Sequence, residues 1–122
     1  MSSEKKIQIV EDEAVTAMLF EKVLTKRGYS VGEIASTGEE AVALVRQNSP
    51  QIVLMDIRLI GDMDGIDAAR KIRSFCSCLI IFVTGYSDDS LRDQALTIPN
   101  TRYFIKPVDF NELISTIEKS VN

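Results

Sequence analysis

Histidine is absent from this 122-residue sequence, and cysteine occurs only twice, at Cys76 and Cys78. A structural zinc site needs four cysteine or histidine ligands, so these two residues are too few to build one. We interpret both as reduced thiols that pack near the start of a buried strand, as free cysteines usually do. A G-x-G-x-x-G motif after the first apolar run is also absent, which disfavours a dinucleotide-binding enzyme.

Long apolar runs and an excess of positive charge are missing as well. The longest apolar run covers residues 78–83, far short of the roughly 20 residues that cross a bilayer, and we expect no membrane span. Residues 1–6 lack the apolar stretch of a secretory signal, so a cytoplasmic location is expected. The formal charge is −4, from 14 basic and 18 acidic side chains, which argues against this domain binding a nucleic-acid backbone.

The residues that are present are typical of a soluble, globular protein. Hydrophobic residues make up 45% of the chain and charged residues 26%, and no repeats or low-complexity stretches interrupt them. A chain of 122 residues can bury one hydrophobic core but has no room for a second. We therefore expect a single domain over residues 1–122.

Short apolar runs rich in β-branched residues alternate with amphipathic segments along the whole chain. The runs predict five buried strands, at residues 7–10, 31–35, 52–55, 79–83 and 103–105. The amphipathic segments predict helices at residues 14–27, 37–48, 64–73, 87–96 and from 109 onward. In the first helix, a stripe at i, i+3, i+4 and i+8 is expected to face the core: Val15, Met18, Leu19 and Val23.

Several of these helices carry start signals. Thr37 with Glu40, and Asp109 with Glu112, have the spacing of a capping box. Asp64 precedes the third helix, and Ser87 is the expected cap of the fourth. The signals support the helix boundaries that the apolar spacing predicts.

Strict strand–helix alternation with short connections predicts an α/β fold. Right-handed crossovers would give a five-stranded parallel sheet covered by helices on both faces, which is a (βα)5 three-layer sandwich. By analogy with flavodoxin-like proteins we assign the strand order 2-1-3-4-5, whose switch point lies between the first and third strands. Ligands of such folds bind outside the carboxyl ends of the strands.

Four of the predicted strands run directly into residues that can handle a phosphoryl group. Glu11 and Asp12 follow the first strand, Asp56 the third, Thr84 the fourth and Lys106 the fifth. Each of them alone is more often a helix cap, a strand-end hydroxyl or a solvated lysine. Together they predict one cleft that holds three carboxylates, a hydroxyl and an ammonium.

The chemistry of this set points to phosphoryl transfer. Crowded carboxylates are costly unless a divalent cation joins them, and Mg²⁺ prefers such hard oxygen ligands. Asp56 stands alone at its strand end, so it is the candidate nucleophile for an aspartyl phosphate. Thr84 could hydrogen-bond a phosphoryl oxygen, and Lys106 could neutralise charge on the transferred group. Pro107 would fix the backbone direction that holds the lysine over the cleft.

From Ile7 to Val121 the sequence resembles a two-component response-regulator receiver domain. The resemblance rests on the acidic pair Glu11-Asp12, on Asp56 within Val53-Leu54-Met55-Asp56-Ile57, on Thr84, on Lys106-Pro107 and on the loop Met63-Asp64-Gly65. It implies that Asp56 accepts a phosphoryl group from a phosphohistidine on a sensor histidine kinase or a phosphotransfer protein. The domain would then be a signalling phosphoacceptor that assists its own phosphoryl transfer and autodephosphorylation, rather than an enzyme.

The resemblance also implies a role for each residue around Asp56. Mg²⁺ would be held by Asp12, by Asp56 and by the backbone carbonyl of Arg58, with Glu11 acting through water. Thr84 and Tyr103 would form the conformational switch. Arg58 and Tyr86, each two residues beyond a site residue, would tune hydrolysis of the phosphoryl group.

The chain departs from the usual receiver pattern at several positions. The stretch 56–65 is one residue longer than the commonest form and carries Ile60 where a proline often stands. Arg102 and the segment 98–100 are also unusual, and they lie on the face that such domains use for output, formed by the fourth helix, the fifth strand and the fifth helix. The output partner is therefore left open.

Two other functions compete with the phosphoacceptor. A pseudo-receiver would bind partners without phosphorylation, but the complete set of site residues disfavours it. A haloacid-dehalogenase-like phosphatase also uses a strand-end aspartate, yet it needs a second aspartate two residues later, where this chain has Arg58.

Overall fold

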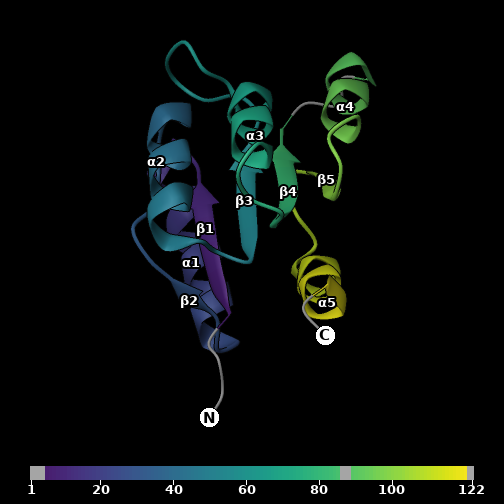
Figure 1. The fold of residues 1–122 in the computed structure, drawn as a ribbon. Helices are drawn as coiled ribbons and strands as arrows, with labels where there is room; N and C mark the ends of the chain where they lie inside the picture. Colours follow the sequence, from purple (N-terminus) through teal and green to yellow (C-terminus); the bar gives the residue numbers. More distant parts are fainter. Residues whose placement is uncertain (1–4, 86–88, 121–122) are drawn as a thin grey trace.

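The computed structural model describes residues 5–85 and 89–120. Strands and helices alternate along these residues as the sequence predicts (Figure 1). The elements are β1 (Lys6–Val10), α1 (Ala14–Lys26), β2 (Ser30–Val31), α2 (Gly38–Asn48), β3 (Ile52–Asp56), α3 (Gly65–Arg73), β4 (Leu79–Thr84), α4 (Asp89–Leu96), β5 (Thr101–Ile105) and α5 (Phe110–Ser120).

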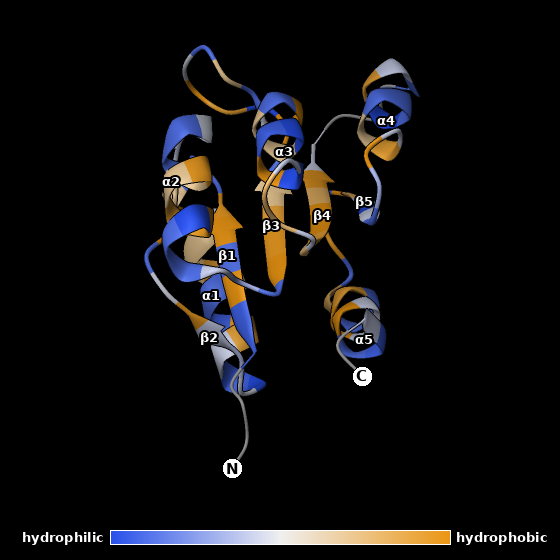
Figure 2. Cartoon of the chain, viewed as in Figure 1, coloured by the Kyte–Doolittle hydropathy of each residue, from blue (hydrophilic) through white to orange (hydrophobic). Residues whose placement is uncertain are grey.

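The five strands form one parallel sheet in the order β2-β1-β3-β4-β5. The predicted fold class and strand order are therefore confirmed. Side chains of α1 and α5 pack on one face of the sheet, and side chains of α2, α3 and α4 pack on the other. Figure 2 shows the central strands in the hydrophobic colour and much of the helical surface in the hydrophilic one, as a sheet buried on both faces requires.

The second strand is shorter than predicted. The sequence indicates a strand over residues 31–35, but β2 contains two residues, Ser30 and Val31, and Ala35 adds an isolated bridge to Val10. Between them the Gln8 side chain donates a hydrogen bond of 2.9 Å to the carbonyl of Glu33. This side-chain bond takes the place of strand pairing at the edge of the sheet.

The first helix buries a different face from the one predicted. Ala17, Phe20 and Leu24 face the core, whereas Val15 and Met18 are 76% and 65% exposed. Both sets of residues have helical spacing, but only the buried set contains Phe20, whose ring meets that of Phe110 edge-on at 5.7 Å. Leu19 is 50% exposed and Val23 is half-buried, so the predicted apolar stripe lies largely on the surface.

The predicted helix starts are largely confirmed. Thr37 accepts a hydrogen bond from the Glu40 amide, and the Glu40 carboxylate accepts one from the Ser36 amide, one residue before the cap. Asp109 accepts bonds from two amides at the start of α5. Asp64 and Asp67 form a reciprocal capping box on α3. The predicted cap Ser87 lies outside the described residues.

The two cysteines lie where the sequence places them, beside the start of β4. Both are free thiols, Cys78 buried and Cys76 half-buried. Burial, and then the neighbouring Cys76, raise the pKa of Cys78 to about 12, so this thiol stays neutral. Among the described residues, none of the helices is both long and apolar enough to cross a membrane.

Candidate functional site

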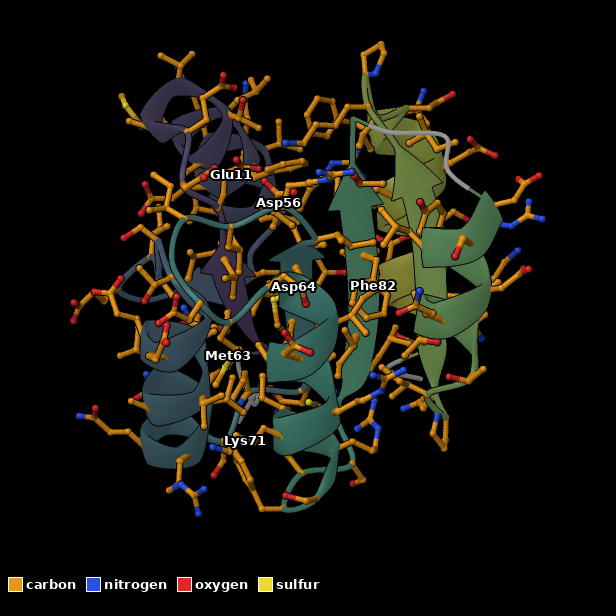
Figure 3. The ribbon with its side chains drawn as sticks, turned by 90° about the horizontal axis from the view of Figure 1, so that it is seen from above. Glu11, Asp56, Met63, Asp64, Lys71 and Phe82 are labelled. Carbon is orange, nitrogen blue, oxygen red and sulfur yellow. The ribbon has the colours of Figure 1, made fainter. Side chains whose placement is uncertain are left out.

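The carboxyl ends of the strands bring the predicted site residues to one edge of the sheet. Glu11 directly follows β1, Asp56 ends β3, Thr84 ends β4 and Lys106 directly follows β5. Strand register keeps them level, because Asp56 pairs with Val83 and the Lys106 amide donates a 2.7 Å hydrogen bond to the Thr84 carbonyl. Figure 3, which looks down on this edge, shows Glu11 and Asp56 next to each other.

Alternation along the strands divides these residues between the two faces. Leu54 packs on the face covered by α1 and α5, so Asp56, two residues further, lies on that face as well. The same rule places Glu11 with Ile9 on this face. Thr84 alternates with Phe82 and lies on the face covered by α2, α3 and α4.

An ion-pair network joins the two acids to the lysine. Lys106 Nζ lies 2.8 Å from Glu11 Oε1 and 3.6 Å from Asp56 Oδ2. The other oxygens of the acids accept backbone hydrogen bonds, Glu11 Oε2 from the Glu13 amide at 3.1 Å and Asp56 Oδ1 from the Arg58 amide at 3.2 Å. Both carboxylates are thereby fixed in orientation, and Lys106 spans the gap between β1 and β3.

Burial beside a second carboxyl group changes the proton affinity of Asp56. Burial raises the pKa of Asp56 from 3.8 to about 7, the charge of Glu11 adds to this rise, and Lys106 opposes it. Burial lowers the pKa of Lys106, but its hydrogen bond to Glu11 and the charge of Asp56 outweigh burial, so the net shift is upward. The lysine therefore remains charged, but its charge does not keep Asp56 fully ionised near neutral pH.

Three carboxylates meet at the position where the sequence predicts a metal. One oxygen atom from each of Glu11, Asp12 and Asp56 lies within 4.8 Å of the others. Hard oxygen donors around a shared space suit Mg²⁺, and a dication would offset the burial and the repulsion from Glu11 that raise the pKa of Asp56. The residues present therefore fit such an ion. Asp12 was a further candidate for the cap of α1, but Glu13 occupies that position.

The loop from Ile57 to Asp64 follows Asp56 and frames the site. The Gly65 amide donates a 2.8 Å hydrogen bond to the Ile57 carbonyl and so closes the base of the loop. A Cβ built on Gly65 would lie 2.1 Å from the Asp56 carbonyl oxygen, so only glycine permits this close approach. Arg58, whose carbonyl is the predicted third metal ligand, stands at the start of the loop and is exposed.

The two residues of the predicted switch lie on the same face of the sheet. Thr84 is fully buried, and Tyr103 is half-buried against the cluster on the α2, α3 and α4 side. Tyr103 pairs with Phe82, two residues before Thr84, so the two side chains are near neighbours along β4 and β5. Tyr86, which is predicted with Arg58 to tune hydrolysis of the phosphoryl group, lies outside the described residues.

Sequence reasoning missed the roles of three residues that shape the site, although Gly65 is part of the motif Met63-Asp64-Gly65. Glu13 orients Glu11 through its amide, Gly65 allows the approach of the loop to Asp56, and Gly38 allows the approach of Met63 to α2. A glycine at the first position of a helix is a signal for close packing, and both Gly38 and Gly65 stand at such positions. The partners of these glycines are visible only in three dimensions.

Known proteins are similar to this chain in sequence and in fold. A family model of the response regulator receiver domain matches residues 7–118. The chain is 34% identical over 118 residues to the transcriptional regulatory protein PdtaR of Mycobacterium tuberculosis, covering 97% of this chain and 57% of that protein. It is 30% identical over 118 residues to the chemotaxis protein CheY of Bacillus subtilis, covering 96% of this chain and 98% of CheY.

Solved structures of receiver domains are also similar to this chain. The signal receiver domain of a modulated diguanylate cyclase from Desulfovibrio desulfuricans G20 superposes with a TM-score of 0.90 at 32% identity, covering 98% of this chain and 94% of that one. A CheY-like receiver domain protein from Methanospirillum hungatei JF-1 gives a TM-score of 0.87 at 30% identity, covering 96% and 93%. The chain therefore belongs to the response regulator receiver domain family.

Proposed function

We propose that this domain is a phosphoacceptor switch in which Asp56 takes a phosphoryl group from a phosphohistidine. The observation that carries the proposal is the convergence of Glu11, Asp12 and Asp56 with the Lys106 ammonium at one strand edge. Receiver domains of two-component systems work with histidine kinases and output domains, and they bind Mg²⁺ at an acidic pocket. In this proposal residues 1–122 form one cytoplasmic domain that modifies itself rather than turning over a substrate.

Asp56 and Lys106 carry the transfer itself. An oxygen of the Asp56 carboxylate forms a bond to phosphorus while the bond from phosphorus to the donor imidazole nitrogen breaks. The Asp56 oxygen must be ionised, and the Arg58 amide holds the carboxylate in place from the other oxygen. Lys106 Nζ, 3.6 Å from Asp56 Oδ2, is positioned to neutralise charge on the arriving phosphoryl oxygens.

The metal site is assigned to Asp12, Asp56 and the backbone carbonyl of Arg58, with Glu11 acting through water. When bound, Mg²⁺ would neutralise the crowded carboxylates and draw the phosphoryl oxygens toward Asp56. Glu11 would reach the ion through a water molecule, while its carboxylate also holds Lys106 and the Glu13 amide. It fixes the lysine that faces the phosphoryl group.

The switch is assigned to Thr84 and Tyr103. Bonding of the Thr84 hydroxyl to a phosphoryl oxygen would favour one of two positions of the half-buried Tyr103 ring. The output surface is then the α4-β5-α5 face, which holds a groove lined by Leu96, Tyr103, Ile105 and their neighbours. Arg58 and Tyr86 are proposed to control the access of water to the phosphoryl group.

The test is intact-mass analysis of the protein after incubation with acetyl phosphate and Mg²⁺. We expect one added phosphoryl group that is lost in both acid and base, as an acyl phosphate is. Wild-type protein that binds Mg²⁺ yet stays unlabelled would contradict the proposal. That result would instead support the alternative of a phosphorylation-independent interaction module.

The exposed apolar face of α1 is the proposed docking surface for the phosphohistidine donor. Val15, Met18 and Leu19 are exposed on α1, the helix that begins two residues after Asp12. We expect Leu19→Glu to slow transfer from a histidine phosphotransfer protein by about tenfold, because loss of one central apolar contact costs about 1.4 kcal/mol. Labelling by acetyl phosphate should be unchanged.

Leu96→Glu is the matched control for this surface. Leu96 is exposed to nearly the same extent, 48% against 50% for Leu19, but it lies on α4. Its replacement should leave donor transfer at the wild-type rate. Equal slowing in both variants, or none in Leu19→Glu, would show that the donor docks elsewhere.

A further inference from the structure

A close contact joins the first residue of α2 to the loop that follows Asp56. A Cβ built on Gly38 would lie 2.7 Å from the carbonyl oxygen of Met63, 2.8 Å from its Cγ and 2.9 Å from its Cβ. Real Cβ atoms essentially never come within 3.0 Å of such neighbours. Since one of the three atoms belongs to the backbone, any side chain at Gly38 would displace the loop itself.

Glycine is required at this position for space, not for backbone conformation. The left-handed glycines of the described chain are Gly28 and Gly61, and Gly38 is not among them. The backbone conformation of Gly38, the first helical residue after the Thr37 cap, would suit alanine, and alanine is the better helix former. The chain thus keeps a poor helix former where the loop passes.

Met63 lies within the segment that frames the candidate metal site. It is half-buried and packs against the cluster on the α2 and α3 side, whereas Ile60 and Gly61 in the same loop are exposed. Figure 3 shows Met63 on the loop between Asp56 and Asp64, where the loop passes α2. The loop therefore has two fixed ends at the site and a third anchor on α2.

The two fixed ends are the hydrogen bonds on either side of this anchor. The Arg58 amide is bonded to the Asp56 carboxylate at 3.2 Å, and the Gly65 amide to the Ile57 carbonyl at 2.8 Å. A shift of Met63 away from α2 would pull on both bonds, because only a few residues separate it from each. The Arg58 carbonyl would move with them.

We propose that Gly38 and Met63 are positioning residues for the phosphorylation site, and that α2 supports the loop that presents the Arg58 carbonyl to Mg²⁺. The proposal rests on the function proposed above. If it is correct, α2 influences the affinity for Mg²⁺ although it contributes none of the proposed metal ligands. Residues that orient a metal ligand from outside typically change affinity by 10- to 100-fold.

The test compares Gly38→Ala with Gly32→Ala. A Cβ on Gly32 would meet nothing within 4 Å, and its backbone is not left-handed, so this variant controls for the added methyl group. By calorimetric titration, we expect Mg²⁺ to bind Gly38→Ala at least about tenfold more weakly than wild type. Gly32→Ala should bind within about twofold of wild type. Asp12→Ala, which removes a proposed metal ligand, shows the titration signal expected when the Mg²⁺ site is lost.

Amide hydrogen exchange in the metal-free protein gives a second measurement that needs no ion. The amides of Arg58 and Gly65 should exchange faster in Gly38→Ala and unchanged in Gly32→Ala. Should Gly38→Ala fail to fold, Met63→Ala is expected to show the same two effects in milder form, and Met63→Leu to stay near wild type. Wild-type exchange together with wild-type affinity in Gly38→Ala or Met63→Ala would overturn the positioning role.

These measurements separate this proposal from the proposed function. Failure of the wild-type protein to bind Mg²⁺ would contradict the metal site, and exchange of the Arg58 and Gly65 amides would still decide whether α2 holds the loop. Normal Mg²⁺ binding by wild type with no change in either variant would contradict the positioning role alone.

Discussion

Asp56→Asn is expected to lose the phosphoryl label completely when the protein is incubated with acetyl phosphate and Mg²⁺. The asparagine amide keeps the shape of the carboxyl group but has no anionic oxygen to attack phosphorus. Of the acids at the strand edge, Asp56 alone lies within 4 Å of Lys106 while also bonding the Arg58 amide. Intact-mass analysis should show no added mass, a loss of more than about 100-fold relative to wild type.

The control is an acid on the neighbouring loop. Asp62 is exposed and lies two residues before Asp64, the cap of α3, and Asp62→Asn should be labelled as fully as wild type. Full labelling of Asp56→Asn would assign the phosphoryl group to another carboxylate. Glu11 would then be the next candidate, because it is also held by Lys106.

Much of the fold could be predicted from the sequence because the central strands are buried on both faces. Their apolar runs at 7–10, 52–55 and 79–83 carry a strong signal, and the structure extends each by only one residue. The edge strand β2 is shorter than its apolar run predicts, because the Gln8 side chain rather than a neighbouring strand bonds the Glu33 carbonyl. The local sequence pattern therefore does not predict where a strand ends when a side chain replaces backbone pairing.

The face of α1 shows a different limit of sequence pattern. Two apolar stripes share this helix, and spacing alone favours the one with Val15, Met18 and Leu19. The structure buries the other stripe because Phe20 has a partner in Phe110, ninety residues away in sequence. The apolar side chains left on the surface are the ones proposed above as the docking surface for the phosphohistidine donor.

The candidate site was predicted more completely than the packing around it. Strand ends are readable from sequence, so Glu11, Asp56 and Lys106 could be placed at one edge before their distances were known. The supports of the site, among them Gly38 against Met63, depend on contacts between segments that no local pattern connects. The residues proposed to do the chemistry were thus easier to find from the sequence than the residues that pack around them.

The raised pKa of Asp56 makes the stability of the metal-free protein depend on pH. Between pH 3.8 and about 7 the folded protein holds a proton on Asp56 that the unfolded chain releases. Stability should therefore fall as pH rises through this range, with the full penalty present above pH 7 and none below the unfolded pKa. A rise from 3.8 to about 7 corresponds to roughly 4 kcal/mol, an upper limit because Glu11 and Lys106 respond together with Asp56.

Asp56→Asn should remove this dependence, because an amide does not titrate. In urea unfolding at pH 8 with a chelator present, we expect the variant to exceed wild type in stability by up to roughly 4 kcal/mol, and the difference to shrink toward pH 5. Added Mg²⁺ should stabilise wild type more than the variant, since the ion takes over the task of neutralising the acids. A difference between the two proteins that stays constant from pH 5 to 8 would mean that Asp56 is not the group whose ionisation strains the fold.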